Sequence, residues 1–385
     1  MRPSVLAALL CASPCCVPLK GSDERADATA QAQAVQCDAA EPPAPPDAAN
    51  GGAAAKGAPS DTSDLVFAVS QIEYGAMTSD DGGPPEYPSI GFDLDHACTG
   101  VGSCIEPSWA LGSHHGGPNG IDNAFGQVVA GQVPNSLPAT WYYPEILLRL
   151  RGYAGQQDQD PVDVVLYIAL GLTARQDGGV GPFWDGQDRW TILPESLVQP
   201  TTGEAAGGYP PRFHANRAYV TRGSLVAEFD ETLWPSGLTN APRILVTARK
   251  LLIAGALVQP GNAGSGWELR NLVVGFRSTQ TDSLKLIGRS PTVFGGAYAQ
   301  PDGGPVTTIC QDPTLYASVK PNLCGVVDIT AAPTAPPTAT CDALSVGMRF
   351  QARQALLGTV AGPAPDPPPC APGVPDPDTC DSLGP

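Results

Sequence analysis

The stretch that decides the fold is Ile146–Arg151, which reads ILLRLR. Its apolar residues recur two positions apart, and Arg149 and Arg151 occupy alternate positions on the opposite side. A two-residue period is that of a β-strand with one buried face and one face turned to solvent. The stretch therefore predicts a strand of a sheet that covers an apolar core.

Similar stretches lie on both sides of it, each bounded by clusters of Gly, Pro, Asn or Asp. The further predicted strands are Leu65–Ser70, Val162–Leu170, Ala218–Phe229, Arg243–Val258 and Trp267–Phe276. We expect short helices at Asp122–Gly131 and at Thr281–Gly288, the second capped by Thr281 or Asp282. Many short strands without regularly alternating helices indicate an all-β fold, a β-sandwich of the jelly-roll or lectin-like kind.

The chain divides by composition into four parts. Residues 1–20 resemble a secretory signal, and Cys11, Cys15 and Cys16 stand where a lipoprotein carries its lipidated cysteine. A plain secretory signal and an ordinary disordered N-terminus remain alternatives. Residues 21–63 are rich in Ala, Pro and Gly and predict a disordered linker, because they cannot bury enough apolar surface to offset their ordering entropy. Residues 64–360 form the predicted β-sandwich domain, and residues 361–385 a proline-rich tail.

Cysteines accompany the folded part and the tail. None forms a CxxC pair or lies at zinc-finger spacing from a histidine, which disfavours a structural zinc site. We expect disulfides, since closely spaced pairs are typical of an oxidising compartment. The expected pairs are Cys98 with Cys104 and Cys310 with Cys324. We expect Cys341 to pair with one of the two cysteines of the tail, Cys370 or Cys380.

An acidic motif is the strongest candidate for a site. Gly91–Asp95 reads GFDLD, and an Asp-x-Asp spacing places Asp93 and Asp95 on one face of an extended segment. Asp122 and Asn123 follow in a second motif and add a carboxylate and an amide oxygen. Oxygen ligands suit Ca²⁺, so the sequence predicts a structural calcium site at these four residues. The alternative is that the same residues cap turns and a helix.

Two further groups of residues offer weaker candidates. Glu228 and Asp230 resemble the strand motif of sandwich-fold glucanases, which needs three alternate carboxylates, but Thr232 stands where the third would be. Trp184 and Trp190 flank an Asp-rich turn and are candidates for stacking on a sugar ring. Tryptophans of this kind are also common core residues.

The motifs in combination resemble those of an uncharacterised family of bacterial secreted proteins and lipoproteins. The likeness covers roughly residues 64–360 and rests on GFDLD at 91–95, GIDNAFG at 120–126, WDGQD at 184–188 and CDALS at 341–345. The resemblance implies export and a single fold. It implies no reaction.

Net charge, apolar runs and the motif search exclude several classes of protein. A net charge of −17 disfavours nucleic acid as a partner, and no apolar run reaches the roughly 20 residues of a membrane-spanning helix. No nucleotide-binding, zinc-protease or serine-hydrolase motif is present. We therefore expect an exported cell-envelope protein, lipid-anchored or extracellular, that acts as a non-catalytic binding or structural module with an envelope glycan as candidate ligand. The alternative is a polysaccharide-acting hydrolase that uses Glu228 and Asp230, or the Asp93 and Asp95 cluster, as acid and base.

Overall fold

The computed structural model describes residues 41–46, 64–74, 89–97, 104–110, 120–129, 136–138, 146–173, 181–236, 244–259, 266–290, 308–362 and 368–383. The predicted signal segment, most of the predicted linker and Cys98 lie outside these residues.

Strands dominate the described residues. They are β1 (Leu65–Glu73), β2 (Ser136–Pro138), β3 (Ile146–Arg151), β4 (Asp163–Leu172), β5 (Arg189–Ile192), β6 (Phe213–His214), β7 (Arg217–Thr221), β8 (Ser224–Ser236), β9 (Ile244–Val258), β10 (Glu268–Thr279) and β11 (Ala343–Val360). The helices are α1 (Ala124–Val129), α2 (Gln280–Arg289) and α3 (Pro313–Cys324), with short 3₁₀ turns at Pro194–Ser196, Ala206–Gly208, Ile309–Gln311 and Cys380–Leu383. The predicted all-β class with a few short helices is confirmed.

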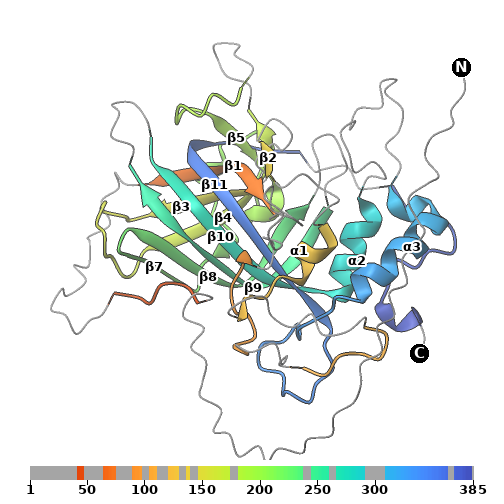
Figure 1. Ribbon diagram of the computed structural model, residues 1–385. Coiled ribbons are helices and arrows are strands. Elements are labelled where there is room, and N and C mark those ends of the chain that lie inside the picture. The colour runs from red at the N-terminus through yellow and green to blue at the C-terminus, as the bar shows by residue number, and fades with distance from the viewer. Residues whose placement is uncertain are drawn as a thin grey trace, which may run out of the picture. The chain divides into compact units, whose positions relative to one another are not determined.

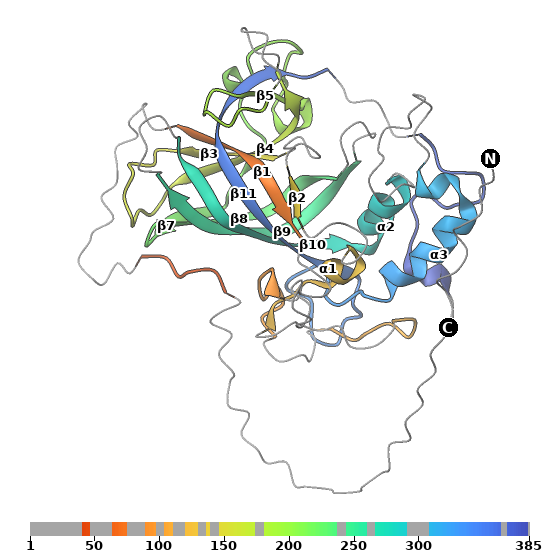
Figure 2. The same ribbon diagram turned by 45° about the horizontal axis from the view of Figure 1, so that its top comes forward.

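All strands belong to one mixed sheet, in the order β2-β1-β3-β4-β5-β11-β10-β9-β8-β7 (Figure 1). Strand β11 also pairs with β1, and β6 pairs with β4. The sheet is so strongly curved that its last strand, β7, lies beside the start of β4. There the Val162 amide donates to the Ala218 carbonyl of β7 at 3.0 Å. Opposite parts of this curved sheet therefore face one another across the core, as the two layers of a sandwich do (Figure 2).

The main core fills the inside of this curl. In β4, Val164, Leu166 and Ile168 point into it, whereas Val165 and Tyr167 belong to a second cluster on the other face. Both faces of β4 are therefore buried. Burial on both faces explains why this strand reads as an almost continuous apolar run rather than as an alternating one.

The longest strand, β11, was not predicted from the sequence. It pairs with β10 and β1 along its first part and runs parallel to β5 at its end, at Leu356 and Leu357. Its sequence, ALSVGMRFQARQALLGTV, is rich in Ala, Leu, Gln, Met and Arg, which favour helices in isolation. Pairing on both sides overrides that local preference.

The helices differ in detail from the expectation. Helix α1 begins at Ala124, and α2 is capped by Thr279, whose side chain accepts from the Asp282 amide, rather than by Thr281 or Asp282. Helix α3 was not predicted. Asp312 caps it and a proline opens its first turn, both of which are common start signals. The three helices lie together at one end of the sheet (Figure 1).

Three disulfides join the described cysteines, and each corrects a predicted pairing. Cys104 bonds to Cys341, Cys310 to Cys370 and Cys324 to Cys380, with Cα–Cα distances of 5.2, 4.9 and 5.6 Å. The predicted link between Cys310 and Cys324 is wrong because α3, 12 residues long, separates them. A helix of that length spans roughly 18 Å, whereas bonded cysteines have Cα atoms no more than about 7 Å apart.

The other two predicted pairings are wrong because Cys104 and Cys341 bond to each other. Cys104 is therefore not available to Cys98, and Cys341 is not available to the tail. Both tail cysteines, Cys370 and Cys380, are nevertheless held by disulfides.

Candidate metal centre

Two segments far apart in sequence meet at the candidate site. The Asp122 amide donates to the Phe92 carbonyl at 2.9 Å, which forms an isolated antiparallel bridge between the two motifs. Gly91 makes this approach possible. Its φ is +145°, and a Cβ there would lie only 2.9 Å from the Asp122 carbonyl oxygen.

Glycines of the sheet make room for the first segment. Gly275 of β10 and Gly347 of β11 lie directly opposite one another in the pairing register. A Cβ on Gly347 would meet the Ile90 carbonyl oxygen at 2.1 Å, and one on Gly275 would meet the Phe92 ring at 2.9 Å. The absence of both side chains lets residues 89–97 lie directly on the sheet.

The fold brings three of the predicted ligands together. One carboxylate oxygen each from Asp93, Asp95 and Asp122 lies within 4.8 Å of the others. Asp93 and Asp122 are 6% and 2% exposed, and Asp95 is half-buried. The Asp122 carboxylate also accepts from the Leu94 amide at 2.7 Å and from the Asp95 amide at 3.2 Å. The two motifs therefore form one compact acidic cluster, and its binding of a metal stays a prediction.

Asn123 makes the contacts of the capping alternative. Its side-chain oxygen accepts from the Gly126 amide and from the Gly347 amide, both at 2.9 Å. An amide oxygen has two lone pairs, and these two bonds use both. Asn123 therefore caps α1 and fastens it to β11, which is the capping alternative, and we leave it out of the ligand set.

Burial dominates the electrostatics of the cluster. Burial, with repulsion from Asp95 and Asp328, raises the pKa of Asp122 to about 9. Burial and the neighbouring Asp95 raise the pKa of Asp93 to about 6. In the absence of a cation, the folded chain therefore disfavours full ionisation of these carboxyl groups at neutral pH.

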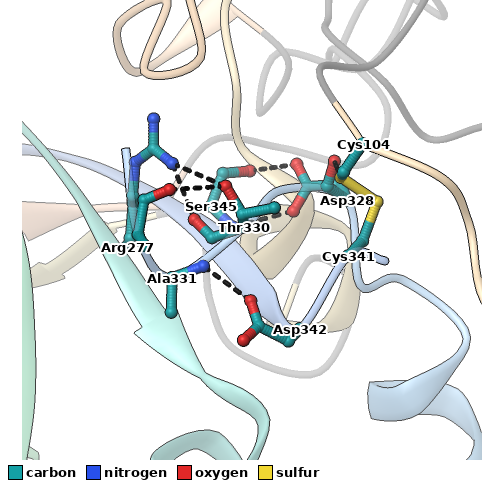
Figure 3. The surroundings of a disulfide bond; sticks show 9 residues. Cys104, Arg277, Asp328, Thr330, Ala331, Cys341, Asp342 and Ser345 are labelled. Carbon is teal, nitrogen blue, oxygen red and sulfur yellow. Dashed lines mark hydrogen bonds between the residues drawn. A yellow bond between two sulfur atoms is a disulfide. The ribbon is translucent and has the colours of Figure 1, made fainter. Parts of the chain in front are cut away.

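A buried arginine lies beside the cluster. Arg277 is 2% exposed, and it donates through Nη1 to the Thr330 carbonyl at 2.6 Å and through Nη2 to the Leu94 carbonyl (Figure 3). Burial lowers the pKa of Arg277, while attraction to Asp95 and Asp122 opposes this effect. The guanidinium therefore fixes the backbone between the two ligands of the first motif and offsets part of their charge.

A fourth carboxyl group lies behind the cluster. Asp328 is 1% exposed and accepts from the Ser345 amide at 2.8 Å and from the Ser345 hydroxyl (Figure 3). The same hydroxyl oxygen accepts from the Ala124 amide at 2.8 Å, so Asp328 holds the start of α1 against β11. Burial raises the pKa of Asp328 to about 7.

Neither Arg277 nor Asp328 was predicted from the sequence. Asp328 stands between the apolar residues Val327 and Ile329, and a carboxylate in such a run is a recognisable sign of burial. Arg277 follows Phe276 near the end of an otherwise ordinary strand and carries no comparable signal.

The carboxylates considered for catalysis lie elsewhere. Glu228 and Asp230 are exposed on β8. Asp230 forms an ion pair with Lys250 and a hydrogen bond with Asn216, and the bond from Lys250 lowers its pKa. These contacts are typical of a solvated strand end, which was the simpler interpretation of this motif.

The two candidate tryptophans stack on each other, with ring centroids 5.9 Å apart and an interplanar angle of 29°. Trp190 is fully buried in the second core cluster and cannot stack on a ligand, which corrects that part of the prediction. Trp184 is only partly buried, and its neighbour Phe183 is 52% exposed. Asp188, fully buried, fixes this turn by accepting from the Phe183 amide at 3.0 Å and the Trp184 amide at 2.7 Å.

A separate apolar pocket of about 60 Å³ opens where the sheet meets α2. Aliphatic and aromatic side chains form most of its wall, and its two serines, Ser278 and Ser283, bond to each other at 2.9 Å. None of the candidate carboxylates lines it. The acidic cluster is therefore not the floor of this pocket.

Comparison with known proteins gives no relative from which a function could be transferred. No protein-family model matches the chain, and no curated protein and no solved structure matches it. The resemblance to a family of secreted proteins and lipoproteins therefore stays a prediction.

Proposed function

We propose that this chain is an exported, non-catalytic module of the cell envelope that is anchored by a lipid at its N-terminal cysteines. The three disulfides carry the proposal, because such bonds persist in oxidising compartments and are rare in the cytosol. No helix within the described ranges is long and apolar enough to cross a membrane.

Fractionation of producing cells tests both halves of this proposal. The full chain is expected in the envelope fraction. It should partition into the detergent phase on detergent extraction, and it should be labelled by a fatty-acid analogue. Substitution of Cys11, Cys15 and Cys16 by Ser should abolish the label. Unprocessed protein in the cytosol, with its thiols open to alkylation, would contradict export, and an unlabelled envelope protein would contradict the lipid anchor.

We further propose that the module binds an envelope glycan at the turn that carries Phe183 and Trp184. Aromatic rings that lie partly in solvent provide a flat apolar face for a sugar ring. Trp184 has a φ of +59°, a conformation that residues other than glycine rarely adopt, and buried Asp188 holds it there. A rigid exposed ring loses little conformational entropy on binding.

A glycan array and a polysaccharide pull-down with the full chain test the ligand. Phe183→Ala should weaken binding, whereas Val198→Ala, which trims another exposed apolar side chain, should leave it unchanged. Equal binding by both variants would overturn the assignment of this turn. Release of new reducing ends from a polysaccharide would instead favour the alternative, a hydrolase.

The surroundings of the carboxylates support the non-catalytic reading. A glycosidase needs two carboxyl groups that flank a bound sugar, about 5 Å or about 6.5–9.5 Å apart. Glu228 and Asp230 are exposed, and Asp230 is engaged by Lys250. Asp93 and Asp122 are buried rather than open to a substrate, and Asp122 accepts from backbone amides.

A further inference from the structure

We propose that Asp93, Asp95 and Asp122 hold one Ca²⁺ ion, which fastens the segment of residues 89–97 and the segment of residues 120–129 to the sheet. The proposal does not depend on the envelope role or on the glycan ligand. It rests on the geometry of the cluster, on an unsatisfied buried oxygen and on local charge.

The unsatisfied oxygen is Oδ1 of Asp93. Asp93 is 94% buried, yet this oxygen has no hydrogen-bond partner. A buried carboxylate oxygen without a donor is costly, and native proteins rarely leave one unmet. Because the Asp93 carboxyl group lies within 4.8 Å of ligand oxygens from Asp95 and Asp122, a cation between the three would supply the missing partner.

Local charge favours a cation as well. Asp93, Asp95 and Asp328 all act by repulsion on Asp122. Among the described residues, the one basic side chain buried beside them is Arg277. It donates to the carbonyls of Leu94 and Thr330 and to the Thr330 hydroxyl. One guanidinium cannot balance four carboxylates, whereas a divalent cation removes most of the excess.

The donor set selects the ion. All the candidate ligand atoms are carboxylate oxygens, which suit Ca²⁺ and Mg²⁺ rather than the softer transition metals. Ca²⁺ accepts irregular sets of 6–8 oxygens and bidentate carboxylates, whereas Mg²⁺ demands a near-ideal octahedron. The three aspartates come from two segments joined by a single antiparallel bridge, and one of them, Asp95, is half-buried. Such a set is not a preformed octahedron, so we assign Ca²⁺.

The cluster lies between two segments that are attached to the sheet by separate contacts. Residues 89–97 are fixed to the sheet mainly by the close approach at Gly275 and Gly347, and by the bond from Arg277 to the Leu94 carbonyl. The second segment is fixed by Asn123 and by the bond from the Ala124 amide to Ser345. An ion held by both segments would join these two separate attachments into one unit.

Calorimetric titration of chelator-treated, full-length protein with CaCl₂ tests the proposal. We expect one Ca²⁺ to bind at this cluster, and Asp93→Asn to weaken binding by about tenfold or more, since even outer-shell changes cost that much at metal sites. Asp230→Asn is the matched control, because Asp230 is an exposed aspartate on β8 outside the cluster. It should bind Ca²⁺ as the unaltered protein does.

Three results would overturn the proposal: no heat of binding at millimolar Ca²⁺, unchanged binding in Asp93→Asn, or Mg²⁺ binding as tight as Ca²⁺. Circular dichroism shows whether Asp93→Asn is folded. If it is not, Asp95→Asn replaces a half-buried ligand at less structural risk, and the same tenfold loss is expected there.

Discussion

The curved sheet and the outer layer that covers one end of it are held together by different forces. We define the outer layer as the described residues of 89–129, 308–342 and 368–383. The sheet encloses a large cluster of aliphatic and aromatic side chains, and no disulfide joins two strands of the described chain. All three disulfides lie within the outer layer. There they accompany apolar clusters that are smaller than the one inside the sheet, and they restrict the unfolded chain where packing contributes less.

The two regions also differ in how deeply one ion pair of each is buried. Lys320 of α3 and Asp378 of the tail form an ion pair at 2.7 Å, with side chains 8% and 5% exposed, and the Tyr316 hydroxyl donates to Asp378 at 2.8 Å. On the outer face of the sheet, by contrast, the pair of Lys250 and Asp230 is largely exposed. The outer layer therefore contains an ion pair that is shielded from solvent, whereas this pair of the sheet is screened by water.

The largest effect should come from the core of the sheet. Phe350 of β11 is 1% exposed and contacts Trp234 at a ring-centroid distance of 6.0 Å. Phe350→Ala should lower the free energy of unfolding by about 3–5 kcal/mol, because it removes apolar contacts and leaves a cavity. Urea denaturation measures this loss. A loss below about 1 kcal/mol would show that packing at β11 does not hold the sheet together.

A smaller and more local effect should follow removal of a disulfide. The bond between Cys310 and Cys370 closes a loop with a sequence separation of 60 residues. The double variant Cys310→Ser, Cys370→Ser should lose about 2–4 kcal/mol. Limited proteolysis should then cut near residues 368–383 while the strands stay intact. Cleavage in β8 or β9 at the same rate would contradict the division between sheet and layer.

The stability of the outer layer should depend on pH through the buried carboxyl group of Asp328. Burial raises the pKa of Asp328 from 3.8 to about 7, so the folded chain keeps a proton there that the unfolded chain loses near pH 4. The stability from this group is therefore full below about pH 4 and is lost as the pH rises to about 7.

Asp328→Asn cannot ionise and should escape this loss. Its stability relative to the unaltered protein should rise between pH 4 and pH 8 by on the order of 2–4 kcal/mol, measured by urea denaturation in chelator. The comparison of the two proteins cancels the titration of carboxyl groups that do not interact with Asp328; Asp122 and Asp95 do interact with it and contribute to the same difference. A constant difference across this range would show that Asp328 titrates normally.

The smallest effect should come from the exposed ion pair on the sheet. Asp230→Asn removes the partner of Lys250, but both side chains are about half-exposed, and such pairs contribute little. The melting temperature should be unchanged within error at low salt. A clear drop would show that surface charge, and not packing alone, stabilises the sheet.

Strands with a clear local pattern were predictable from the sequence. Ile146–Arg151 became β3 with its expected bounds, because one of its faces is buried and the other carries the arginines. The sequence also indicated Asp93, Asp95 and Asp122 as candidate ligands by their residue types, whereas the meeting of their two segments is a result of the fold. What was predictable in both cases acts between neighbours in sequence.

The rest depends on contacts that no local pattern encodes. β11 reads as a helix former and becomes a strand because β10 and β1 pair with it. Cys104 and Cys341 are 237 positions apart, so spacing could not reveal their bond. Trp190 stayed a candidate for stacking on a sugar ring, beside the core alternative, because the sequence does not show where its ring packs.

Hydrogen exchange in Ca²⁺ and in chelator tests most directly whether the two regions depend on different forces. The account predicts that chelation speeds exchange of the amides in residues 89–97 and 120–129, including the Leu94 amide that donates to Asp122. The amides of β4, β8 and β9 should exchange at the same rate in both conditions. Equal protection of residues 89–97 with and without Ca²⁺, or loss of protection throughout the sheet on chelation, would contradict it.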